Sequence, residues 1–221
     1  MKPLEITVID DELMLLLEIA RVLGEDVEPR IGREVTVHAF ETLEESKKVE
    51  GNRKYGESSQ KLIIMDLFLK EPENGFFEMR RGNLRERYDG VIAMSRLDRL
   101  PIIRSLLNQG FCHAYIPKRG GSLDEMVEAV VCLGTGSRYR NKTMLAALEC
   151  REPDPFERLS ALEIQILQLT HVEQLHPKGI ATLLDCEPKT VYSNRARAHR
   201  KLGTNVDREV YMMLVLHGYA S

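Results

Sequence analysis

The sequence has no long hydrophobic run among its 221 residues. Its longest apolar stretches, such as Met14–Leu17 and Met212–Leu216, are far shorter than the roughly 20 residues that a transmembrane helix needs. The opening residues MKPLEITVID also lack a basic segment followed by a long apolar one, which argues against a secretory signal. We therefore expect a cytoplasmic protein with no membrane partner.

Cysteine is scarce, and the few cysteines are scattered along the chain. No two of them have the C-x-x-C spacing, so reduced thiols of a cytosolic protein are the expected state. The four are Cys112, Cys132, Cys150 and Cys186.

An excess of basic residues is missing as well, since the net charge is −3, which by itself argues against nucleic-acid binding. The charge is unevenly distributed, however. Residues 1–134 contain 19 Lys and Arg against 24 Asp and Glu, whereas residues 135–221 contain 12 against 10. Within the second part, Pro188–Gly203 carries five basic residues and no acid. This asymmetry indicates two functions on one chain.

The first part alternates short β-branched runs with segments of helical periodicity. One such helix is expected at Leu100–Gln109, ended by Gly110, and another is expected to open with a capping box of Ser122 and Glu125. This alternation predicts an α/β fold, a doubly wound five-stranded parallel sheet of order 2-1-3-4-5. The five predicted strands are Leu4–Ile9, Val35–Phe40, Leu62–Met65, Val91–Met94 and Ala114–Ile116.

Polar side chains stand where these strands end. Asp10 and Asp11 follow the first strand, Asp66 ends the third, Ser95 ends the fourth and Lys118 follows the fifth. In this topology the carboxyl ends of the strands share one crevice, so we expect these groups to converge. Oxygen-only ligation beside a phosphate suits Mg²⁺. A carboxylate there can act as a nucleophile and form an aspartyl-phosphate, with the lysine and the hydroxyl stabilising its oxygens.

About residues 4–133 resemble the receiver domain of bacterial two-component response regulators, which has a flavodoxin-like fold. The resemblance implies that Asp66 is the phospho-acceptor and that Lys118 and Ser95 are switch residues. It also implies that Tyr115 is the aromatic side chain that changes rotamer on activation. The matching stretches are VIDDE (8–12), LIIMD (62–66), VIAMS (91–95) and YIPK (115–118).

The same resemblance implies a metal site made by Asp10, Asp11, Asp66 and the backbone carbonyl of Phe68. Three features depart from the family pattern: an apparent insertion at Gly51–Gln60, the turn LFLKEPENG in place of a Met-Pro turn, and Arg96 directly after Ser95. Two roles are open for Arg96, because its guanidinium can hinder solvent access to the phosphoryl group or pair with an acid of the pocket.

The second part reads as a small all-α domain with a helix-turn-helix. A connector at 134–158, with a short helix near Thr143–Glu149, precedes a capping box of Ser160 and Glu163. A helix is expected from Pro177 to Leu184, followed by a tight connection and a further helix from Pro188 to Leu202, and two helices joined in this way are a helix-turn-helix. The predicted domains are 1–133, 134–158 as linker and 159–221.

The stretch LSALEIQILQL…GIATLLDCEPKTVYSNRARAHRKLG resembles the LuxR-type DNA-binding domain that ends NarL/FixJ response regulators. A recognition helix presents its N-terminal side chains to base edges while other cations contact phosphates. The residues expected to bind DNA, from this resemblance and from the basic faces of the helix, are Lys178, Lys189, Thr190, Val191, Tyr192, Asn194, Arg195, Arg200 and Lys201. A last helix, Val206–Tyr219, has an apolar stripe that either packs in the core or forms a dimer contact.

These observations predict a DNA-binding response regulator, not an enzyme with turnover. Its expected partners are double-stranded promoter DNA, a sensor histidine kinase or phosphotransfer protein, and a second copy of the chain on DNA. Two alternatives stay open. In one, the receiver fold is a protein-interaction or ligand-sensing module independent of phosphorylation. In the other, the first part is a phosphatase or hydrolase that uses Asp66, although no general acid is evident beside it.

Overall fold

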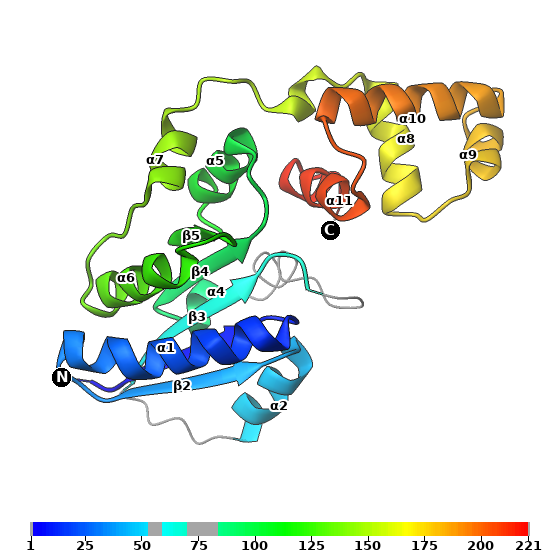
Figure 1. Ribbon diagram of the computed structural model, residues 1–221. Coiled ribbons are helices and arrows are strands. Elements are labelled where there is room, and N and C mark those ends of the chain that lie inside the picture. Colours follow the sequence, from blue (N-terminus) through cyan, green and yellow to red (C-terminus); the bar gives the residue numbers. More distant parts are fainter. Residues whose placement is uncertain (1, 53–58, 70–83, 221) are drawn as a thin grey trace. The chain divides into compact units, whose positions relative to one another are not determined.

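The structure is a computed structural model that describes residues 2–52, 59–69 and 84–220 (Figure 1). The chain forms two compact units, Met1–Cys150 and Arg151–Ser221. Most of the predicted insertion at 51–60, and residues 70–75 of the unusual turn after Asp66, lie outside the described residues.

The first unit is built on a five-stranded parallel sheet, as predicted. The strand order is β2-β1-β3-β4-β5, which confirms the order 2-1-3-4-5. In the register, Ile9 lies opposite Met65 and Asp66 lies opposite Met94, so the strands end close together along one edge. The strands are β1 (Leu4–Ile9), β2 (Val35–Phe40), β3 (Gln60–Asp66), β4 (Gly90–Ser95) and β5 (Ala114–Pro117).

Helices connect the strands and cover the sheet. The helices α1 and α6 pack against each other, α1 contacting β2 and α6 contacting β5, whereas α5 packs against β5 and α7. Burial of apolar side chains on both faces, such as Ile64 on one face and Ile63 on the other, gives the central strands their continuous hydrophobic character. The helices are α1 (Leu13–Ile31), α2 (Leu43–Asn52), α4 (Leu84–Arg87), α5 (Leu100–Asn108), α6 (Ser122–Gly134) and α7 (Lys142–Glu149).

The predicted capping box of Ser122 and Glu125 is wrong. Ser122 is the first residue of α6, and the residue before it, Gly121, has a φ of 83° and no side chain that could cap. The Ser122 hydroxyl accepts a hydrogen bond from Arg119 N at 2.7 Å and donates to the carbonyl oxygens of Pro117 and Arg119. It therefore closes the turn after β5 instead of capping the helix.

The second unit is helical. The capping box of Ser160 and Glu163 is present at the start of α8, as predicted. Between α9 and α10 the chain turns sharply, with Asp185 at a φ of 49° and Cys186 N donating to Ala181 O at 3.0 Å. This arrangement of α9 and α10 is the predicted helix-turn-helix. The elements are η1 (Pro155–Arg158), α8 (Ala161–His171), α9 (Pro177–Leu183), α10 (Pro188–Leu202) and α11 (Asp207–Leu216).

The expected connector contains regular structure. The short helix predicted near Thr143–Glu149 is α7, and it packs against elements of the first unit. The chain turns away just after the end of α6, at Gly136, whose φ of 77° favours glycine. No helix in the described ranges has the length and apolar character needed to cross a membrane.

Candidate functional site

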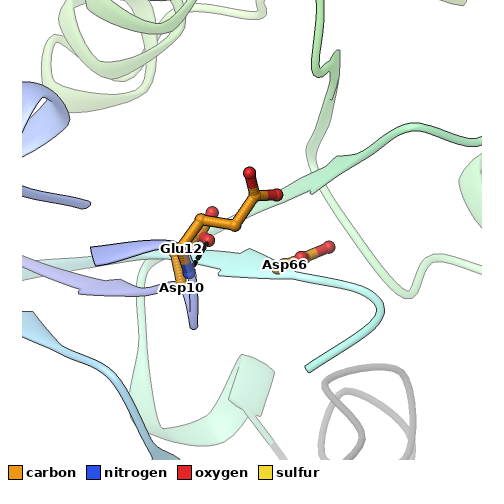
Figure 2. A group of neighbouring side chains, drawn as sticks. All are labelled: Asp10, Glu12 and Asp66. Atoms are coloured by element: carbon orange, nitrogen blue, oxygen red, sulfur yellow. Dashed lines mark hydrogen bonds between the residues drawn. The ribbon is translucent and has the colours of Figure 1, made fainter. Parts of the chain in front are cut away.

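An acidic group lies at the carboxyl edge of the sheet, where the sequence predicts convergence. Asp10 follows β1 and Asp66 is the last residue of the neighbouring β3. Carboxylate oxygens of Asp10, Glu12 and Asp66 all lie within 4.8 Å of one another, and Figure 2 shows the three side chains gathered at the ends of these strands.

The ammonium group of Lys118 lies among the three acids. Its Nζ is 2.8 Å from Asp10 Oδ2, 2.7 Å from Asp66 Oδ2 and 3.2 Å from Glu12 Oε1, and its side chain is 5% exposed. Burial lowers the pKa of Lys118, but the charges and hydrogen bonds of Asp66 and Asp10 outweigh it, so the pKa is raised. The lysine is therefore a permanent cation at neutral pH.

Backbone amides fix the other carboxylate oxygens. Glu12 N donates to Asp10 Oδ1 at 2.9 Å, and Phe68 N donates to Asp66 Oδ1 at 3.0 Å. Burial raises the pKa of Asp10, and it outweighs the opposing hydrogen bonds from Lys118 and Glu12. The ligand atoms that Asp10, Glu12 and Asp66 offer are carboxylate oxygens. The acidic group therefore fits a hard divalent cation such as Mg²⁺.

The predicted switch residues, Ser95 and Tyr115, meet at the loop after β4. Both are fully buried. The Ser95 hydroxyl accepts a hydrogen bond from Leu97 N at 3.1 Å, and the Tyr115 hydroxyl donates to Leu97 O. Burial raises the pKa of Tyr115, so the phenol stays protonated and remains a donor. The two side chains are thus coupled through one loop residue.

Arg96 pairs with an acid of the pocket, which is one of the two roles left open by the sequence. Its Nη2 lies 2.9 and 2.7 Å from the two carboxylate oxygens of Glu12. Although burial raises the pKa of Glu12, the nearby Lys118 and Arg96 outweigh that effect and lower it.

Glu12 was not predicted and Asp11 is outside the acidic group. The third acid of VIDDE and the arginine after Ser95 were the sequence features that could have revealed this pair.

The predicted DNA-binding residues differ in accessibility within the second unit. Four are exposed: Lys178, Lys189, Tyr192 and Arg200. Three are partly exposed: Thr190, Arg195 and Lys201. The exposed side chains place positive charge and one aromatic ring on α9 and α10.

Two of the predicted DNA contacts are corrected by the structure. Val191 is fully buried and packs with Ile166 and Ile180 in the core of the unit. Asn194 is 8% exposed, and its Nδ2 donates to Thr190 O at 2.8 Å on the preceding turn. Their side chains hold α10 in place and do not form part of the exposed face.

Lys201 is engaged in an ion pair inside the second unit. Its Nζ is 2.6 Å from Glu163 Oε2, and Glu163 is fully buried. Burial raises the pKa of Glu163, but the hydrogen bonds from Lys201 and Ser160 outweigh it and lower the pKa. Lys201 therefore links α8 to α10, and its contact with a DNA phosphate stays a prediction.

The chain is similar to curated bacterial regulators over nearly its whole length, although no protein-family model matches it. It is 31% identical to response regulator GacA of Pseudomonas syringae pv. syringae over 223 residues, which cover 97% of each chain. The chain belongs to the response regulator family. This response regulator is also 29% identical to UvrY of Escherichia coli over 186 residues, 77% of its own length and 83% of UvrY.

The fold of this response regulator is that of RcsB. It matches the two-component response regulator RcsB in a DNA complex with a TM-score of 0.60 at 20% identity, over all of both chains. The prediction of a regulator with a receiver unit and a helical unit is thus confirmed. The family consists of regulators, in line with the expectation that no turnover enzyme is encoded.

A buried histidine makes the stability of the second unit sensitive to pH. The side chain of His171, at the end of α8, is 6% exposed, and its ring meets that of His199 edge-on with centroids 5.9 Å apart. Burial lowers the pKa of His171 to about 4, with His199 and Arg195 adding to the effect and Asp207 opposing it. The folded state therefore holds a neutral ring at pH values where an unfolded chain, with a pKa of about 6.5, binds a proton.

We expect the second unit of this response regulator to lose about 2 kcal/mol of stability between pH 7 and pH 5 because the unfolded state gains the proton first. Thermal unfolding of the full chain, followed at signals of α8 and α10, measures this loss. His171→Phe should flatten the pH dependence, whereas His176→Gln, at an exposed histidine, should not. An unchanged slope in His171→Phe contradicts the prediction.

Proposed function

We propose that this response regulator is a cytoplasmic DNA-binding transcription regulator switched by phosphorylation of Asp66. The phosphoryl donor is a phosphohistidine of a sensor kinase or phosphotransfer protein. The observation that supports this proposal most directly is the Lys118 ammonium group held between Asp10 and Asp66 at the carboxyl edge of the sheet.

In the proposed reaction a carboxylate oxygen of Asp66 attacks the phosphorus atom of the donor. The new P–O bond forms as the P–N bond breaks, and the leaving imidazole keeps the electron pair and takes up a proton. Lys118, already 2.7 Å from Asp66 Oδ2, neutralises the phosphoryl oxygens, and the Ser95 hydroxyl donates a hydrogen bond to one of them. Attack by a carboxylate requires no further general base.

A divalent cation fits the same acids. Asp10 and Asp66 would hold it, with the predicted ligands Asp11 and the Phe68 carbonyl completing an oxygen-only set. When bound, Mg²⁺ supplies positive charge beside the phosphoryl oxygens. Lys118 already contacts Asp10 and Asp66, so it would share these two carboxylates with the cation.

The switch follows from the shared contacts of the loop after β4. Phosphorylation adds about −1.5 to −2 charge units to Asp66 and draws Lys118 and Ser95 toward it. Ser95 holds Leu97 N and Tyr115 holds Leu97 O, so a shift of Ser95 alters the position of the tyrosine hydroxyl. The surface of β4 and β5 therefore changes with the phosphorylation state, as a phospho-switch requires.

Promoter DNA is the proposed target of the second unit. The exposed Lys189, Tyr192 and Arg200 lie on α10, the second helix of the helix-turn-helix, and Lys178 lies on α9. Thr190 and Arg195 are partly exposed on the same helix. RcsB, which has this fold, has been solved as two dimers bound to two parallel DNAs. We therefore propose that this chain also binds DNA as a homodimer.

Titration with beryllofluoride, a phosphoryl mimic, tests the proposal. With Mg²⁺ present, we expect amide signals of Phe68, Leu97 and Lys118 to shift, and no shift without Mg²⁺. The absence of any Mg²⁺-dependent change would favour the alternative function, in which the receiver is a protein-interaction or ligand-sensing module. That alternative is consistent with the neutralisation of the acids by Lys118 and Arg96.

Arg96→Gln should tighten Mg²⁺ binding about threefold because it removes a screened positive charge from an exposed ion pair beside the metal ligands. The Arg96 side chain is 72% exposed, so the fold should be little affected. Mg²⁺ titration monitored by amide signals near Asp66 measures the change. Arg119→Gln is the matched control, because Arg119 follows Lys118 but pairs with Glu125. Weaker or unchanged Mg²⁺ binding in Arg96→Gln would contradict this account.

A further inference from the structure

A cavity lies at the opposite edge of the sheet from the acidic group. It has a volume of about 440 Å³. Gln60, Asp89 and His113 line it from the amino ends of β3, β4 and β5, and Gly136–Arg140 form part of its wall. Gln60 and Asp66 are the two ends of β3, and at 3.3 Å per residue the two sites are about 20 Å apart. The cavity is therefore separate from the phosphorylation site.

The lining of this cavity carries an excess of positive charge. Arg85 comes from α4, and Arg138 and Arg140 come from the segment after α6. Among the described residues of the lining, Asp89 is the single acid, and its Oδ2 accepts a hydrogen bond from Lys61 N at 2.8 Å. Three guanidinium groups thus face one carboxylate that already has a backbone donor.

These arginines differ from the other arginines of the first unit. Among the residues that the structure places, neither Arg85 nor Arg138 has a hydrogen bond or ion pair, and Arg140 donates only to the carbonyl of Tyr139, at 2.8 Å. Six described arginines elsewhere in the unit are bonded to a carboxylate or a carbonyl: Arg21, Arg30, Arg33, Arg96, Arg104 and Arg119. Among the described arginines of the first unit, those without a bonded partner, Arg85 and Arg138, therefore both line this cavity, and their planar donors match a phosphate or a carboxylate.

The local structure positions the hydrogen-bond donors of Arg85 and His113 at the cavity. The Arg85 guanidinium lies against Gly110, where a Cβ atom would come within 2.8 Å of Nη1, and the φ of 73° at Gly110 also favours glycine. His113 Nδ1 accepts from Val91 N at 3.0 Å, which assigns the ring proton to Nε2. Burial and the nearby Arg85 lower the pKa of His113, so it is a neutral donor at pH 7.

We propose that this cavity binds a phosphate-bearing small molecule, of mononucleotide size or smaller, between Arg85 and Arg138. Its volume falls within the range of about 300–1,000 Å³ that is typical of ligand pockets. Since Arg138 and Arg140 belong to the segment that leaves α6, the bound anion holds this segment to the sheet. The site gives the receiver unit an input that does not depend on phosphorylation of Asp66.

Titration of the full chain with pyrophosphate, AMP and citrate at constant ionic strength tests the proposal. We expect saturable shifts of the amide signals of His113, Gly136 and Tyr139 with a phosphate probe, in wild type and in Asp66→Asn. The double variant Arg85→Gln/Arg138→Gln should weaken binding at least about tenfold because it removes the charge-assisted hydrogen bonds. The matched control, Arg21→Gln/Arg30→Gln, removes equal charge from the surface and should bind as wild type does.

Four results would overturn the proposal. They are the absence of saturable shifts with every probe, equal weakening in the two double variants, shifts confined to the surroundings of Asp66 and Lys118, and binding of citrate without binding of either phosphate probe. The first three remove the cavity as a site, and the fourth removes phosphate as the ligand class. Unfolding measured on each variant shows that a loss of binding is not a loss of fold.

Discussion

Replacing Asp66 by asparagine should abolish the gain in promoter affinity that a phosphodonor produces in the wild type. We expect that gain to be about tenfold, in the range of ordinary allosteric coupling. The amide of asparagine is not a nucleophile toward phosphorus, but it keeps the shape of aspartate, and its carbonyl oxygen can still accept the hydrogen bond from Phe68 N. Promoter binding measured with and without phosphodonor, for both proteins, gives the result.

The control for this experiment is Asp124→Asn, at an exposed acid in the first turn of α6. It should respond to the phosphodonor as the wild type does. Without phosphodonor, all three proteins should bind DNA equally. Equal promoter affinity under every condition would exclude the switch and leave DNA binding intact. An equal gain in affinity in Asp66→Asn would show that a residue other than Asp66 is phosphorylated.

The central strands could be predicted from sequence because burial on both faces requires continuous apolar runs, whereas β2, of which no residue is buried, was predicted from its β-branched character. β1 and β2 were predicted residue by residue, and the other three were each extended by one or more residues in the structure. The start of α6 could not be predicted, because the serine and glutamate spacing is typical of a capping box. The Ser122 hydroxyl instead bonds within the preceding turn, which no local pattern reveals.

The convergence of polar side chains at the candidate site could be predicted from the topology of the sheet. Carboxyl ends of neighbouring parallel strands meet, so Asp10, Asp66 and Lys118 had to approach one another. The choice between Asp11 and Glu12 was not predictable, because the direction of a side chain after a strand depends on loop dihedral angles. Here Glu12 reaches the other acids and meets Arg96, which comes from a distant loop.

On α10, helical periodicity predicted an inward stripe that included Val191, Arg195 and Ala198, with the arginine head reaching solvent, and it placed Asn194 on another face. Asn194 also fits this periodicity, three residues after Val191 and four before Ala198. The structure buries Asn194, because its amide can donate to Thr190 O and so lose little on leaving water. The arginine-lined cavity was beyond prediction, since it joins segments that are far apart in sequence.

The second large effect concerns Lys118. We expect Lys118→Met to destabilise the first unit by about 3–5 kcal/mol in the absence of divalent cations, because it leaves buried charges without their partner. Asp10 and Asp66 are 0% and 5% exposed, and Lys118 is the cation that contacts both. Methionine keeps a similar apolar stem, so the loss reports the missing ammonium group and not a cavity.

Mg²⁺ separates this explanation from a general packing defect. If the carboxylates lack a countercharge, Mg²⁺ should raise the unfolding temperature of Lys118→Met more than that of the wild type, because only the folded state gathers the acids. Lys142→Met, at the exposed start of α7, is the control and should change stability by less than about 0.5 kcal/mol. A Lys118→Met protein as stable as the wild type, or one that Mg²⁺ stabilises no more than the wild type, would show that the lysine does not hold these acids together. The basis of the proposed phosphorylation site would then be lost.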